Sequence, residues 1–169
     1  MTRAMIAGLF TPEQSQHHMA LLREHLLYPD GARLMDQPVA YRGGLEVNFR
    51  RAESAAFFGR EIGLMYGHSH LRYCEALDAL GETEAARQAM RVVNPISVTD
   101  DLPNASLRQR NAYFSSSDAA FRDRAEASAE WAKVKRGEVA VDGGWRIYSS
   151  GAGIFTRLAL KFQQDTPVA

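Results

Sequence analysis

Two long stretches without a regular hydrophobic period constrain the fold of this chain more than any other feature. Residues 32–49 and 96–117 are rich in polar, charged and turn-forming side chains, and neither repeats apolar residues at helical spacing. Helical bundles usually join their helices through about 2–8 residues, so a simple bundle does not fit this pattern. Long loops in a compact domain tend to carry function. The pattern favours a helical toroid whose loops build a site at the helix ends.

The first predicted helix covers residues 12–28. Thr11 and Gln14 form the two halves of a capping box, and Pro12 stands at the first helical position, where its missing N–H costs nothing. Apolar side chains recur at helical spacing up to Tyr28, and Pro29 then ends the helix.

Residues 50–80 look helical but contain Gly59, Gly63 and Gly67 at intervals of four. One interpretation is a single long helix whose glycine stripe packs closely against a neighbour. The other is two elements, residues 52–62 and 68–80, joined by an irregular piece. Each glycine inside a helix costs about 1 kcal/mol relative to alanine, so we prefer two elements.

Two further helices are predicted downstream. Gly81 is suited to the position after a helix, and the next helix spans residues 83–93 before Asn94-Pro95 stops it. Another helix is predicted to begin at a cap provided by Ser117 or Asp118 and to run to residue 135. Gly137, two residues later, prevents it from continuing. Its thin apolar side is expected to consist of Phe121, Ala125, Ser128 and Ala132.

The closing stretch, residues 143–162, combines a turn at Gly143 and Gly144, a strand-like aromatic run over 145–148, a loop of small residues over 149–153 and an apolar helix. A Ser/Gly loop that leads into a helix directs several backbone N–H groups and the positive end of the helix dipole at one point. An anion site is therefore one interpretation. The alternative is that Gly151 and Gly153 only allow two backbones to pass closely.

Composition excludes several classes of protein. The 169 residues carry a formal net charge of zero, with 24% charged and 46% hydrophobic side chains, which argues against disorder and against a nucleic-acid-binding surface. No run approaches the roughly 20 apolar residues of a membrane span. The apolar segment 4–10 is short for a signal peptide. We therefore expect a single globular domain, residues 1–169, with neither nucleic acid nor membrane as a partner.

Histidine and cysteine do not form a metal-binding pattern. Cys74 is the only cysteine, which excludes an internal disulfide and is typical of a reducing, cytoplasmic location. His17 and His18 diverge on a helix, and no carboxylate is placed to complete a ligand set with His18 and His25. His70 and Cys74, four residues apart, are interpreted as core or as the wall of a sugar subsite. We expect no metal.

Three segments together resemble a known family. These are Glu61-x-Gly63-x-x-Tyr66-x-His68 with Gly81 and Asn94-Pro95 behind it, and the closing Gly143-Gly144-Trp145-x-x-Tyr148-Ser149-Ser150-Gly151-Ala152-Gly153. Their order and spacing resemble the cellobiose-phosphorylase-like enzymes of glycoside hydrolase family 94. The resemblance implies an all-α fold, the (α/α)6 toroid, of which this chain would supply only the C-terminal helices.

The resemblance also implies a set of site residues. In the family the matching histidine and closing loop hold inorganic phosphate, which points to His68, Ser149 and Ser150. Ser149 keeps the hydroxyl of the family's threonine, whereas Ser150 stands where the family has glycine, so Gly151 is the candidate to let backbone approach the anion. Arg72 follows His68 by four residues and shares its helical face. The aromatic residues of the two motifs are expected to contact substrate: Tyr66, Trp145 and Tyr148.

The implied reaction is inverting phosphorolysis or glycosyl transfer on a β-linked glucoside. Phosphate is already a nucleophile, so the carboxylate that activates water in an inverting hydrolase gives way to a cradle for a dianion. Inorganic phosphate would be a co-substrate, and no other cofactor is expected. In the family the general acid is an Asp from a segment N-terminal to everything present here. The loop or cap residues Asp36, Asp100, Asp101 and Asp118 do not replace it.

The chain is therefore expected to contain no catalytic residue and to be inactive alone. Its partners would be an oligosaccharide or disaccharide, phosphate, and the missing barrel portion or a partner chain, with a homo-oligomer as a further option. The alternative function is a non-catalytic helical interaction module. It predicts one continuous helix through Gly59, Gly63 and Gly67 and no anion-sized pocket. A nucleotide-phosphate site is not favoured, because the sequence lacks the P-loop pattern that such a site requires.

Overall fold

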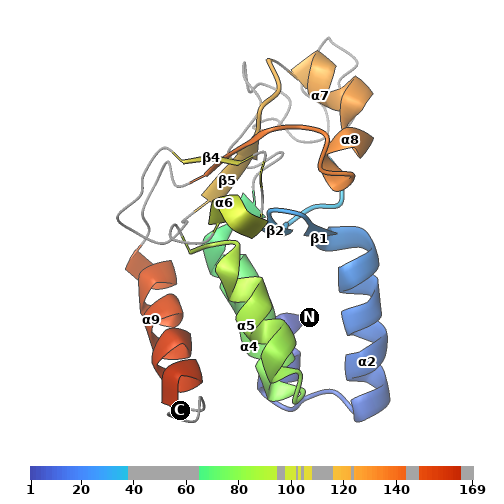
Figure 1. The fold of residues 1–169 in the computed structure, drawn as a ribbon. Coiled ribbons are helices and arrows are strands. Elements are labelled where there is room, and N and C mark those ends of the chain that lie inside the picture. The colour runs from blue at the N-terminus through green and yellow to red at the C-terminus, as the bar shows by residue number, and fades with distance from the viewer. Residues whose placement is uncertain are drawn as a thin grey trace.

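The computed structural model describes residues 1–37, 65–94, 98–101, 103, 105–107, 116–122, 124–143 and 149–164. Helices make up most of this part of the chain, as predicted (Figure 1). They are α1 (Thr2–Ile6), α2 (Pro12–Leu21), the π-helix η1 (Leu22–Leu26), α4 (Gly67–Ala79), α5 (Thr83–Arg91), α6 (Val98–Asp101), α7 (Arg124–Glu130), α8 (Ala132–Lys135) and α9 (Ser149–Gln164). Their arrangement as part of an (α/α)6 toroid stays a prediction.

The predicted capping box begins α2. The backbone N–H of Thr11 donates to Oε1 of Gln14 at 2.9 Å, and the backbone N–H of Gln14 donates to Oγ1 of Thr11 at 3.2 Å. The helix then widens into the π-turn η1, and the chain becomes extended at β1 (Leu27–Tyr28), which pairs with β2 (Gly31–Ala32). The predicted helix is correct at its start and two residues too long at its end.

Helix α4 is the centre of the main core. It contacts α1, α5 and α9, and its fully buried side chains include Leu71, Cys74 and Leu77. It is preceded by the strand β3 (Met65–Tyr66) and begins at Gly67, so a single helix does not run through Gly67 from the residues before it. The continuous helix required by the interaction-module alternative is therefore wrong. Gly59, Gly63 and the predicted helix 52–62 lie outside the described residues.

A Schellman motif ends α4 at the predicted glycine. Gly81 adopts φ +83°, its N–H donates to the carbonyl of Asp78 at 3.0 Å, and the N–H of Glu82 donates to the carbonyl of Leu77 at 2.9 Å. Helix α5 follows directly and packs on α4, which confirms the predicted helix 83–93 to within two residues at its end. The turn thus holds two antiparallel helices together.

A small four-stranded sheet was not predicted. Its order is β3–β5–β6–β4, with β4 (Ala105–Leu107), β5 (Ser116–Ala119) and β6 (Val141–Gly143). Helix α6 and strand β4 fall inside residues 96–117, which were expected to form one long loop, so that expectation is wrong in part. Gly143 ends β6 and pairs with Ser117, and is therefore part of a strand and not of the predicted turn.

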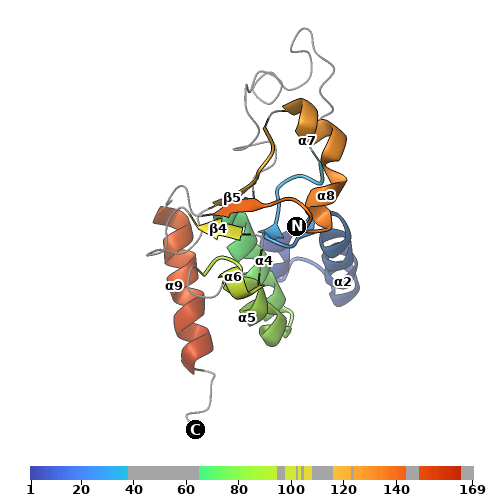
Figure 2. The same cartoon turned by 45° about the horizontal axis from the view of Figure 1, so that its top comes forward.

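The sheet sets the direction of two helices. Strands β3 and β6 both pair antiparallel with β5, so they run in the same direction. Strand β3 leads directly into α4, and five residues separate the end of β6 from the start of α9. Helices α4 and α9 contact each other, and the two views show them side by side below the sheet (Figures 1 and 2).

A second, smaller core lies beyond the sheet, where α7 and α8 stand in Figure 2. The expected helix from Ser117 or Asp118 is wrong at its start, because these residues belong to β5 and α7 begins at Arg124. The expected apolar face is wrong in part, since Phe121 packs against this core but Ala125 and Ala132 are exposed. The buried side chains are instead Ala127, Trp131 and Val134, which pack with Tyr28 and Ala119.

Trp131 connects this second core to the β1–β2 hairpin and the residues that follow it through hydrogen bonds. Its Nε1 donates to the hydroxyl of Tyr28 at 3.0 Å and to the carbonyl of Asp36 at 2.8 Å. The guanidinium of Arg33 lies 5.0 Å from the ring centroid of Tyr28 and 5.4 Å from that of Trp131, and it pairs with Asp30 at 2.6 Å. A buried ion pair between two aromatic rings thus joins segments about a hundred residues apart.

Candidate anion-binding site

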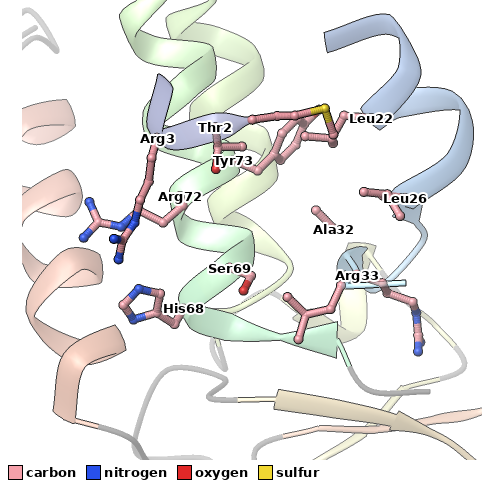
Figure 3. Close-up of a pocket in the computed structure, with 12 residues that line it drawn as sticks. Thr2, Arg3, Leu22, Leu26, Ala32, Arg33, His68, Ser69, Arg72 and Tyr73 are labelled. Carbon is pink, nitrogen blue, oxygen red and sulfur yellow. The ribbon is translucent and has the colours of Figure 1, made fainter. Parts of the chain in front are cut away.

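A cavity of about 380 Å³ lies between α1, η1, β2 and the first turns of α4 (Figure 3). His68 and Arg72 line it from α4, as their spacing of four residues predicts. Apolar side chains such as Leu22 and Leu26 form the opposite wall. The interaction-module alternative predicted no anion-sized pocket, and this prediction is therefore wrong.

Arg3 is a member of this site that no sequence motif marks. It comes from α1 and lines the same cavity as His68 and Arg72. Figure 3 shows the guanidinium groups of Arg3 and Arg72 on the same side of α4, beside the imidazole of His68. No carboxylate is among the described residues that line the cavity. This excess of positive charge suits an anionic ligand.

The ring of His68 is held beside that of Tyr66. The two rings are nearly parallel, with an interplanar angle of 10° and centroids 6.1 Å apart. Partial burial lowers the pKa of His68, and the positive charges of Arg72 and Arg3 lower that pKa further. Without an anion the imidazole is therefore neutral at neutral pH, and it can donate one hydrogen bond and accept another.

Two ion pairs fix α9 against α4. The carboxylate of Glu75 pairs with Arg157, and that of Asp78 pairs with Lys161. Both pairs advance in the same direction along the two helices, so α4 and α9 are parallel. The apolar face of α9 completes the contact with the main core through Ile154, Leu158 and Phe162.

The register of these pairs brings the two predicted motifs to the same level. His68 lies seven residues before Glu75, and Ser150 lies seven residues before Arg157. Seven residues correspond to about 10 Å along a helix and return to nearly the same face. The backbone at the start of α9 therefore lies at the level of His68, on the side of α9 that pairs with α4.

The predicted loop of small residues is helical. Residues 149–153 form the first turns of α9, and Gly151 is buried there. The first four N–H groups of a helix have no partner within the helix, so Ser149, Ser150 and Gly151 still present backbone donors. What changes is the geometry, because these donors follow the helix axis and do not surround a ligand. Trp145 and Tyr148 lie outside the described residues.

His70 and Cys74 are core residues. The Nδ1 of His70 accepts from the N–H of Ala32 at 2.9 Å, and its Nε2 donates to the carbonyl of Ala89 at 2.6 Å. Gly31 has φ +125°, and a Cβ at this position would lie 3.0 Å from Nδ1 of His70. The glycine therefore permits the hairpin to approach the ring. Burial lowers the pKa of His70 and raises that of Cys74.

Three of the four acidic residues expected to be loop or cap residues have backbone or side-chain contacts in the described part of the chain. Asp101 pairs with Arg91 at 2.9 Å, and the backbone carbonyl of Asp36 accepts from Trp131. Asp118 lies in β5, opposite Asp142 of β6.

Among the described residues, no group of three or more His, Cys, Asp or Glu side chains could hold a metal ion. No helix within the same part of the chain is long and apolar enough to cross a membrane.

Comparison with known proteins shows a match to part of a longer protein. No family model matches the chain. It is 52% identical over 155 residues to a protein of Listeria innocua serovar 6a (strain ATCC BAA-680 / CLIP 11262) named 1,2-beta-oligoglucan phosphorylase. The alignment covers 92% of this chain but 14% of the Listeria protein. Identity at this level over such a length shows that the chain is homologous to a segment of that protein.

Proposed function

We propose that this chain contributes the phosphate-binding part of an inverting phosphorylase that acts on β-1,2-linked glucans. The homology to a protein with that name supports the class of reaction. The observation that carries the site is the parallel register of α4 and α9, which brings His68, next to Arg72 in the cavity, to the level of the first residues of α9. The enzyme's full activity would require residues that this chain does not supply, including the general acid.

The proposed site divides the work among its groups. Arg72 and Arg3 supply the positive charge, and His68 donates a hydrogen bond from a neutral imidazole. The backbone N–H groups at the start of α9 add further donors and the positive end of a helix dipole. Together they would hold a phosphate dianion in place as the nucleophile that attacks the anomeric carbon. Tyr66, Trp145 and Tyr148 are proposed to contact the sugar.

Binding of phosphate to the chain itself provides the first test. We expect saturable shifts of the His68 imidazole signals in NMR spectra, together with a rise in its pKa, because a bound anion stabilises the imidazolium. His68→Gln should weaken binding about tenfold, the equivalent of one charge-assisted hydrogen bond of ~1.4 kcal/mol. His17→Gln, on the exposed side of α2, is the matched control and should change nothing. Absence of saturable binding, or equal losses in both variants, would contradict the proposal.

Exchange of segments provides the second test. The 155-residue segment of the Listeria protein is replaced by the matching part of this chain, and release of sugar phosphate from a β-1,2-glucan is measured. We expect the hybrid to keep phosphate-dependent activity and His68→Gln in the hybrid to raise its KM for phosphate. A folded hybrid whose activity does not depend on phosphate would refute the assignment.

A further inference from the structure

Glu75 is an acidic side chain of α4 that links Arg72 on the same helix to Arg157 of α9. It is 6% exposed, and its two oxygens serve two different arginines. Oε2 accepts from Nη1 of Arg72 at 2.6 Å, and Oε1 pairs with Nη2 of Arg157. Among the described residues, only these two ion pairs engage the carboxylate. One buried negative charge is thus shared between two helices.

The bond to Glu75 restricts how Arg72 can point. A guanidinium is planar and carries its donors in a fixed fork, so engaging Nη1 orients the remaining N–H groups. The Nε of Arg72 is buried and has no hydrogen-bond partner among the described residues. Its side chain lines the cavity beside His68 and keeps 28% of its surface exposed. Because Nε is buried, it is the Nη donors left unused by Glu75 that can face a ligand in the cavity.

We propose that Glu75 is a positioning residue of the anion site, which orients Arg72 toward the ligand and holds the start of α9 at the level of His68. The inference rests on the proposed function, because it assumes phosphate as the ligand. Glu75 itself does not touch the anion. Its negative charge alone would weaken phosphate binding, so a net benefit has to come from the orientation of Arg72.

This role differs from simple helix packing, and α4 contains the control that separates the two. Asp78 lies almost one turn further along α4 and pairs with Lys161 of α9, as Glu75 does with Arg157. Asp78 also accepts from Thr83 at 3.1 Å, and neither Thr83 nor Lys161 is among the described residues that line the cavity. Asp78→Asn therefore weakens the same helix contact and leaves Arg72 in place.

The experiment compares wild type, Glu75→Gln and Asp78→Asn in two measurements on the chain. Phosphate affinity is measured by NMR titration, and the order of the Arg72 side chain is followed through its Nε–Hε resonance without phosphate. We expect Glu75→Gln to weaken phosphate binding about tenfold, as for the loss of one charge-assisted hydrogen bond. We also expect the Nε–Hε resonance of Arg72 to move to the averaged position of a freely rotating side chain. Asp78→Asn should leave both measurements unchanged.

The outcomes separate this inference from the proposed function. Unchanged or tighter phosphate binding in Glu75→Gln shows a role as counter-charge and overturns the inference while leaving the site intact. Equal losses in Asp78→Asn and Glu75→Gln reduce Glu75 to a packing residue. Wild type that binds no phosphate overturns the proposed function and the inference with it. Should Glu75→Gln fail to fold, Glu75→Asp keeps the charge but withdraws it from Arg72, and unchanged affinity in that variant also refutes the role.

Discussion

His70 makes the stability of the fold depend on pH in a way that a single substitution can isolate. The side chain is 1% exposed, and both ring nitrogens are engaged, Nδ1 as acceptor from Ala32 and Nε2 as donor to Ala89. A second proton on Nδ1 would face the N–H of Ala32 and remove this acceptor. Burial lowers the pKa of His70, although the hydrogen bond to Ala89 and the charge of Asp30 act in the opposite direction. The folded state therefore favours the neutral ring.

The sign and size of the effect follow from this lowered pKa. In the unfolded chain the imidazole takes up its proton near the ordinary pKa of 6.5, so below that pH the unfolded state binds more protons than the folded state. Stability is thus fully present above pH 6.5 and is lost as the pH falls, by up to ~1.4 kcal/mol per pH unit. Between pH 7.5 and 5.5 the contribution of His70 reaches about 1.4 kcal/mol when the folded ring stays neutral throughout.

The assay is urea unfolding of wild type and His70→Gln at pH 7.5 and pH 5.5. Glutamine can occupy part of the site and does not titrate, and at pH 7.5 its imperfect fit should cost about 1–3 kcal/mol. Contributions from His68 and from the other histidines are common to both proteins and cancel in the difference. Between pH 7.5 and pH 5.5 we expect the free energy of unfolding of wild type to fall by about 1.4 kcal/mol more than that of His70→Gln. Equal losses of unfolding free energy in the two proteins, with an unchanged slope of that free energy against urea concentration, would refute the reasoning.

Further substitutions test individual features of the fold by urea or thermal unfolding. Gly153→Ala should stabilise the protein by ~0.5–1 kcal/mol, because this glycine lies within α9 and an added Cβ meets nothing within 4 Å. Gly81→Ala, equally free of contacts but at φ +83°, should destabilise it by about 1 kcal/mol. Trp131→Phe removes the bond to the Tyr28 hydroxyl and should cost about 1–2 kcal/mol, whereas a cost near zero would argue against this link. Cys74, fully buried and with a raised pKa, should react with thiol reagents at pH 8 only after denaturant is added.

The candidate site was partly accessible from sequence. His68 and Arg72 share a face by their spacing alone, and the structure brings both to one cavity. Arg3 carried no signal, because 64 residues separate it from the nearest member of the site and no local pattern marks an arginine on a five-residue helix. Trp145 and Tyr148 stay predictions, since they lie outside the described residues.

Errors in the predicted fold arose where long-range pairing competes with local preference. Ser117 and Asp118 are good helix caps, yet they pair with Gly143 and Asp142 in the sheet, and the helix starts later. The face of α7 and α8 was misassigned for a similar reason. Alternating alanines suit either side of a helix, and burial was decided by Trp131, whose ring reaches Tyr28.

Local chemistry in the sequence determined the ends of several helices. The capping box at Thr11 and the left-handed Gly81 act over a few residues, because they satisfy backbone groups that each helix end leaves open. Tertiary structure alone decided that α4 and α9 are parallel and in register. That relation depends on a sheet whose strands lie far apart in the chain and on ion pairs from Glu75 and Asp78, and neither leaves a periodic trace in the sequence.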